Sequence, residues 1–104
     1  MIVSTTQDIP GREITEVLGL ARGNSVRARH AGRDIMAGLR NLVGGEISED
    51  AKLQAETREM ATRRMEEFAE SIGADAVVGV RYTTSMIASG ASEILAYGTA
   101  VKLS

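Results

Sequence analysis

The sequence predicts a two-layer α+β domain in which three long antiparallel strands pack with one long helix and a short helix. Apolar residues recur at steps of three and four across residues 48–72, the spacing of a helix that lies on a core. Three other stretches alternate in side-chain size, as strands with two different faces do. A chain of 104 residues can bury one such core, so residues 1–104 are expected to form a single domain.

The N-terminal part is expected to contain two strands. Residues 2–6 are typical of a short strand, and a turn follows around Pro10. Residues 13–26 alternate between a face of small side chains, called the light face, and a face of larger ones. The light face consists of Thr15, Val17, Gly19, Ala21 and Gly23. The other face consists of Ile14, Glu16, Leu18, Leu20 and Arg22. The light face would let the helix or another backbone approach this strand closely.

The middle of the chain is expected to form a helical hairpin. Residues 27–32 are a basic connecting loop, and residues 34–43 form a short apolar-faced helix that ends at Gly44-Gly45. The long helix follows directly, with Ser48 as its N-cap and Glu49 and Asp50 as favourable charges in its first turn. Its predicted core stripe consists of Leu53, Thr57, Met60, Ala61, Met65, Phe68, Ala69 and Ile72.

The C-terminal part predicts an antiparallel hairpin. Gly73 ends the long helix, residues 75–87 and 93–103 form strands, and small residues between them form the turn. Val, Leu and Tyr side chains occur on both faces of these strands, whereas one helix covers only one face of a sheet. The uncovered face would be an apolar patch on a monomer, so we expect a homo-oligomer.

Composition excludes several classes of function. No apolar run is long enough to span a membrane, and the N-terminus lacks the pattern of a signal peptide. The absence of cysteine fits a cytoplasmic protein and removes thiolate chemistry. A net charge of −2 and three aromatic residues, one Phe and two Tyr, oppose nucleic-acid binding. A single histidine and no serine in a nucleophile elbow leave little support for acyl transfer.

Five motifs, in this order and spacing, resemble the YbjQ-like family, whose members are described as "putative heavy-metal-binding". They are Ser4-Thr5-Thr6, Glu16-Val17-Leu18-Gly19, residues 33–40 continuing to 43–46, residues 73–81 and residues 96–101. The resemblance implies a dodecin-like β/α subunit that assembles as a homopentameric ring with the help of short extra strands, a role that would suit residues 1–6. Two positions depart from the family: Asp50 replaces a common tyrosine, and residues 81–84 lack the acids of some members.

A metal site would depend on His30, because imidazole and thiolate are the ligands that heavy metals prefer and this chain has no thiolate. Asp34 could join it only if helix extends back across Gly32, and pentameric symmetry could gather five copies of His30 around an axis. The alternative is an exposed loop histidine. Oxygen ligands among Glu46, Glu49 and Asp50 form a second candidate, although these acids are also favourable first-turn charges.

An anion site is the other candidate, formed by a cluster of Arg27, Arg29, Arg33 and Arg40. Arg33 and Asp34 begin the predicted short helix, whose free amides could help to hold a phosphate or carboxylate between subunits. The alternative is that Arg33 and Arg40 pair with acids on a neighbouring subunit's long helix. Arg81, on a strand beside Gly79, leaves the same choice open and would need a partner if it pointed inward.

The sequence therefore favours a cytoplasmic, homo-oligomeric binding or scaffold protein with a small anionic ligand or a divalent or heavy metal ion between subunits. Its predicted ligand-binding residues are Arg33, Asp34, Arg40 and Arg81, and its predicted metal ligand is His30. No catalytic residue is predicted. The alternative function is a small enzyme whose site at the subunit interface uses Arg33, Asp34 and His30.

Overall fold

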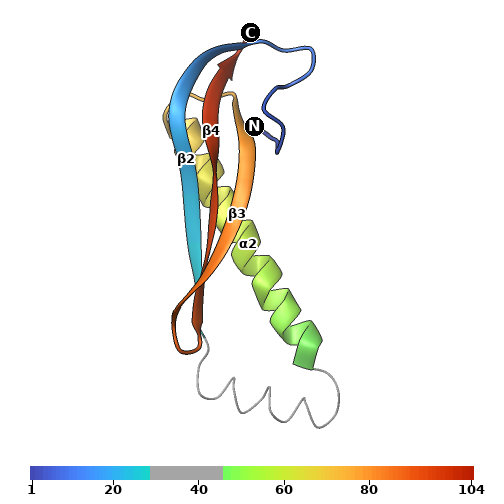
Figure 1. Ribbon diagram of the computed structural model, residues 1–104, viewed down its shortest axis with the longest axis vertical. Coiled ribbons are helices and arrows are strands. Elements are labelled where there is room, and N and C mark those ends of the chain that lie inside the picture. Colours follow the sequence, from blue (N-terminus) through green and yellow to red (C-terminus); the bar gives the residue numbers. More distant parts are fainter. Residues whose placement is uncertain (29–45) are drawn as a thin grey trace.

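The computed structural model describes residues 1–28 and 46–104. In this part of the chain the elements are β1 (Ile2–Val3), β2 (Ile14–Ala28), α2 (Glu46–Ser71), β3 (Ala76–Ala88) and β4 (Ala91–Leu103). The strands form one mixed sheet in the order β1-β3-β4-β2, and α2 lies across one face of it (Figure 1). The predicted two-layer α+β architecture is confirmed, whereas the predicted short helix at 34–43 lies outside the described residues.

The sheet is organised around β4. Strands β3 and β4 form the predicted antiparallel hairpin, in which Ala88 pairs with Ala91 across a two-residue turn. The turn contains Gly90 at a φ of 75°, a conformation that glycine adopts without strain. The other edge of β4 pairs with β2 in antiparallel register along nearly its whole length. β1, which confirms the short strand expected near the N-terminus, pairs in parallel with β3, so the sheet has four strands and is mixed and not purely antiparallel.

Irregularities beside two glycines overturn the expected assignment of side chains to faces. In β2 the register shifts between Val17 and Gly19, so Leu18 packs with the core residue Ala21 although the pattern placed them on opposite faces. In β3 it shifts after Val78, and both Val77 and Val80 join the core beside α2. The simple alternation is therefore wrong across both points, because one extra residue in a strand exchanges its two faces.

Helix α2 buries a narrower stripe than the sequence predicts. Its buried residues are Thr57, Ala61, Met65 and Ala69, one on each successive turn. The neighbouring predicted stripe residues are exposed: Met60 by 36%, Phe68 by 44% and Ile72 by 39%. The helix also begins at Glu46, so the prediction that Ser48 is its N-cap is wrong.

A close contact between backbones explains the narrow stripe. A Cβ atom at Gly23 of β2 would overlap the backbone of Ala61 and Met65 and would lie 2.7 Å from the carbonyl carbon of Arg64. The Arg64 guanidinium also donates a 2.8 Å hydrogen bond to the Asn24 carbonyl. The predicted close approach along the light face of β2 is confirmed here, and it leaves only a thin row of helix side chains between the layers.

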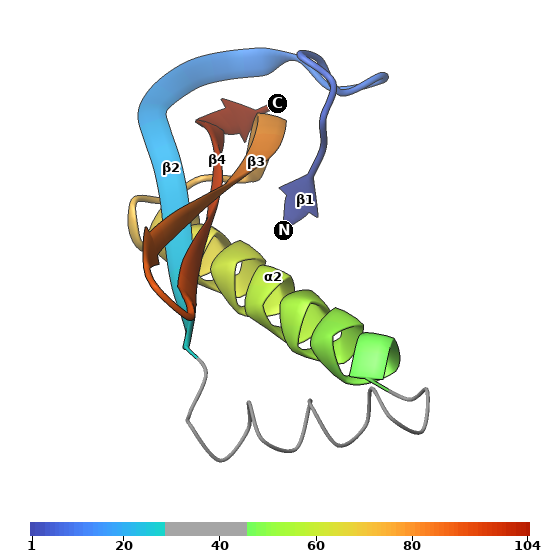
Figure 2. The same ribbon diagram turned by 60° about the horizontal axis from the view of Figure 1, so that its bottom comes forward.

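The N-terminal segment covers one end of the other sheet face (Figure 2). Ile9 and Ile14 pack there on a second core cluster, formed by Ala76, Val78, Val101 and Leu103. Backbone hydrogen bonds continue beyond β1, because the Ser4 amide donates to the Val77 carbonyl and the Gly79 amide donates to the Thr6 carbonyl. The part of this face farther from the N-terminal segment is open.

The far half of β3 is uncovered on both of its faces. Every residue from 81 to 88 is exposed, and β1 pairs only with the first residues of the strand. The molecule measures 55 × 24 × 17 Å, and its radius of gyration is 17.3 Å. A compact domain of this length has a radius of gyration of about 13 Å. The chain is therefore drawn out along its hairpin.

Candidate functional site

Of the predicted site residues, Arg81 falls in the described part of the chain; His30, Arg33, Asp34 and Arg40 lie outside it. Arg81 follows the irregularity at Gly79, and its Nη1 atom donates to the Thr5 carbonyl at 3.1 Å and to the Val80 carbonyl at 2.8 Å. The partners of this guanidinium are therefore backbone carbonyls. Arg81 fastens the N-terminal segment to β3, and its predicted role in binding a ligand stays a prediction.

The described residues do not fit a heavy-metal site. Glu46, Glu49 and Asp50 lie in the first turns of α2, where the helix dipole favours negative charge. Among the side chains that the structure describes, those of residues 1–27 and 51–104, no group of three or more His, Asp or Glu is placed to hold a metal ion. With no cysteine in the sequence, His30 supplies the one imidazole that such a metal could use.

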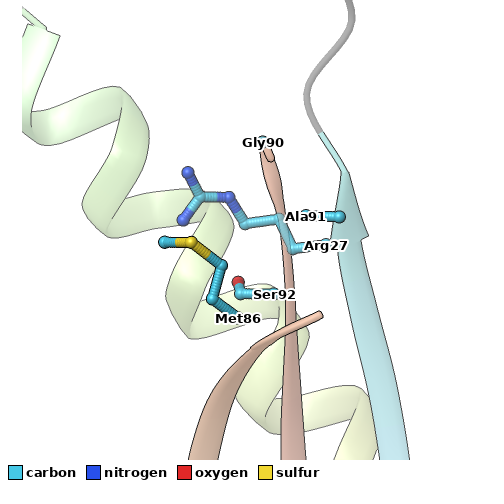
Figure 3. Close-up of a pocket in the computed structure, with 5 residues that line it drawn as sticks. All are labelled: Arg27, Met86, Gly90, Ala91 and Ser92. Atoms are coloured by element: carbon cyan, nitrogen blue, oxygen red, sulfur yellow. The ribbon is translucent and has the colours of Figure 1, made fainter. Parts of the chain in front are cut away.

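A hollow of about 370 Å³ lies beside the tip of the hairpin, lined by Arg27, Met86, Gly90, Ala91 and Ser92. Figure 3 shows the Arg27 guanidinium and the Met86 thioether projecting into the same space beside α2. The Nη1 atom of Arg27 donates a 2.9 Å hydrogen bond to the Gln54 side chain, which links the end of β2 to the helix. This hollow thus places one cation and one apolar side chain beside the tip of the hairpin.

A second hollow, of about 380 Å³, lies on the open sheet face, lined by Leu20, Arg22, Thr83, Leu95 and Tyr97. The strand register explains why these residues meet, because Arg22 of β2 and Arg81 of β3 both pair with Tyr97 of β4. Leu20 and Arg22 lie two residues apart and therefore share a face. We call this hollow the sheet groove.

The sheet groove was not predicted from the sequence, although the sequence pattern correctly grouped two pairs of its residues. The alternation of β2 placed Leu20 beside Arg22, and that of β4 placed Leu95 beside Tyr97. The missing step was that β2 pairs with β4 in the register that sets Arg22 opposite Tyr97. The pattern of either strand alone does not contain that information.

Comparison with known proteins identifies the family. A family model described as "putative heavy-metal-binding" matches residues 1–104, the whole chain. The chain belongs to the YbjQ-like family. The resemblance inferred from the five motifs is thereby confirmed.

Curated relatives of this YbjQ-like chain match it from end to end. A UPF0145 protein of Methanosarcina acetivorans is 59% identical over 103 residues, which cover 99% of this chain and 97% of the relative. A UPF0145 protein of Vibrio campbellii is 58% identical and covers 99% of both chains. That of Archaeoglobus fulgidus is 53% identical, over 99% of this chain and 95% of its own.

A solved structure supports the fold of the YbjQ-like chain. It is a crystal structure of a protein with unknown function from Pediococcus pentosaceus, assigned to the DUF74 family. The TM-score is 0.69 over 100% of this chain and 98% of the other, at 16% sequence identity. At that identity the likeness concerns the fold alone. Among the helices that the structure describes, none is long and apolar enough to cross a membrane.

Proposed function

We propose that the protein is a homo-oligomeric binding protein that holds a small anionic ligand or a metal ion between its subunits. The observation that carries this proposal is the far half of β3, where residues 81–88 are exposed on both faces and along one edge. Met86 is 80% exposed and Ile87 is 57% exposed, beside an irregularity in the pairing of β3 with β4. Large apolar side chains in such a position are typical of an interface.

The two open edges of the sheet favour a ring. Strand β2 is the edge on one side, and the far half of β3 is an edge on the other side. An unpaired strand edge recruits another strand, and long exposed edges are unusual in monomers. A contact between two different surfaces of the same chain is repeated around an axis and closes when the rotation allows it. The family resemblance gives five as the proposed number of subunits.

The predicted ligand residues belong to this proposal as parts of the interface. Arg33, Asp34 and Arg40 would hold an anion between neighbouring subunits, and Arg81 would contribute from β3. The description of the family supports a metal ion as the second candidate ligand. Because the described residues lack a group of metal ligands, such a site would depend on copies of His30 from several subunits.

Native mass spectrometry of the purified protein tests the assembly. We expect a pentamer for the wild type and smaller species for the double variant Met86→Asp, Ile87→Asp. The control is Lys52→Asp, an exposed helix position that produces the same change of −2 in net charge without altering the hairpin. A wild-type monomer would exclude the proposal, and a double variant that stays fully assembled would exclude this interface.

Metal binding is tested separately on the assembled protein. Equilibrium dialysis against Zn²⁺, Cu²⁺ and Ni²⁺, followed by elemental analysis, should give less than one ion per subunit if copies share a site. His30→Ala should abolish that binding without changing the native mass. If the wild type retains no ion above the level of His30→Ala, the metal ion is removed from the proposal and the anion remains.

A further inference from the structure

We propose that the sheet groove binds an organic anion with an aromatic or other flat apolar body. This deepens the proposed binding function, on which it rests, by assigning a ligand class to residues that lie outside the predicted site. The inference depends on the juxtaposition of one arginine, one tyrosine and two leucines on the open sheet face. Each of them comes from the described part of the chain.

The strand register places the charged group beside the aromatic ring. Arg22 lies directly opposite Tyr97 across the β2–β4 pair, and side chains that are opposite each other in a sheet are close enough to interact. Leu20 is 60% exposed and Tyr97 is 36% exposed, so both have surface available to a ligand. In the groove, Arg22 of β2 and Thr83 of β3 thus lie on opposite sides of the Leu95 and Tyr97 side chains of β4.

Arg22 has donors available for an anion. Its guanidinium makes no hydrogen bond or ion pair with another of the described residues. The nearest acid along β4 is Glu93, whose Oε2 atom already accepts a 2.9 Å hydrogen bond from the Asn24 amide. The planar guanidinium presents parallel N–H groups that match a carboxylate or phosphate in two simultaneous hydrogen bonds.

The apolar side chains that line the groove favour an anion with an apolar body. A bare inorganic anion would contact Arg22 and leave the surfaces of Leu20, Leu95 and Tyr97 in water. An aromatic body would cover the leucines and stack against the tyrosine ring, which adds attraction beyond the burial of area. The volume of about 380 Å³ lies within the range of small-molecule sites, about 300–1,000 Å³. An aromatic carboxylate therefore uses every part of the groove.

The test uses 2-naphthoate as the probe and 2-naphthamide as its neutral counterpart. Isothermal titration of the full chain should give saturable binding of the carboxylate and at least tenfold weaker binding of the amide. Arg22→Gln should weaken 2-naphthoate binding by about tenfold or more, because a charge-assisted bidentate contact is lost. Arg63→Gln is the matched control, since it removes an exposed arginine on α2 and should leave the affinity unchanged.

A second variant separates the site from a merely charged surface. Tyr97→Leu should weaken the naphthalene compound while leaving the weak affinity for acetate unchanged, and NMR shifts on probe addition should centre on Leu95 and Thr83. Absence of saturable binding, or equal affinity in wild type and Arg22→Gln, would overturn the inference. Native mass measured on the same samples distinguishes this result from a failure of assembly.

Discussion

At Gly23 the backbones of β2 and α2 meet without a side chain between them. The two layers are consequently closer at this point than alanine would allow, and the helix carbonyl of Ala61 and amide of Met65 occupy the space of a Cβ atom. These are backbone atoms inside a helix, so they cannot rotate away as a flexible side chain would. Relief of the overlap requires that the whole helix move.

Gly23→Ala is therefore expected to lower the free energy of unfolding by about 2–3 kcal/mol, the upper part of the range for overpacked cores. Urea denaturation followed by circular dichroism measures the effect. Lys52→Ala, at an exposed position of α2, is the control and should change stability by less than about 0.5 kcal/mol. An unchanged midpoint for Gly23→Ala would contradict the close packing of the two layers.

Arg81 joins residues that are far apart in the chain, since its guanidinium reaches the Thr5 carbonyl. Arg81→Ala should increase amide exchange of Ser4 and Gly79 by roughly fivefold, for a hydrogen bond worth about 1 kcal/mol. Hydrogen exchange resolved by NMR measures it. Arg63→Ala should leave these amides unchanged, and equal protection in Arg81→Ala would show that the N-terminal segment does not depend on this arginine.

At the scale of elements, α2 presents two adjacent apolar stripes and buries only one of them. Met65 is fully buried against the sheet, whereas Met60 on the neighbouring stripe is partly exposed. The exposed stripe continues through Phe68 and Ile72, so the helix has apolar surface beside its buried stripe. The two methionines allow the stripes to be compared with one residue type in one helix.

Met65→Ala should destabilise the chain by about 2–5 kcal/mol, because it removes a buried side chain and leaves a cavity. Met60→Ala should cost less than about 1 kcal/mol in the isolated subunit, since much of this side chain is already in water. Thermal denaturation at low protein concentration compares them. Equal losses would mean that both stripes are buried and that the assignment of the core is wrong.

Sequence patterns located most elements, because alternation and helical spacing follow directly from backbone geometry. Residues 13–26 and 93–103 match β2 and β4 closely, and residues 75–87 match β3 within one residue at each end. The faces were less predictable: Gly19 and Gly79 carry positive φ values beside irregularities, but a glycine in a strand pattern does not by itself reveal an extra residue. The sheet groove depended on strand register, a long-range property.

For the whole molecule, the long hairpin has consequences for thermal stability. If neighbouring subunits cover residues 81–88, folding and assembly are linked, and the melting temperature depends on protein concentration. Calorimetry between 5 and 500 μM should show the melting temperature rising with concentration for the wild type. The double variant Met86→Asp, Ile87→Asp should melt at a temperature independent of concentration, and a wild type that behaves the same way would count against assembly.

The order of strands in the sheet also sets the order in which the chain can fold. Strand β4 lies between β3 and β2 in the sheet but follows both in the chain, so β2 has no strand partner until residues 91–103 have emerged. Ile14 pairs with Leu103 and Ile2 with Ala76, which gives the sheet contacts of long sequence separation. Such topologies fold slowly, because the chain loses the entropy of loop closure before the long-range contacts form that stabilise the fold. On the ribosome the long strand β2 therefore stays without a strand partner until β4 has been synthesised.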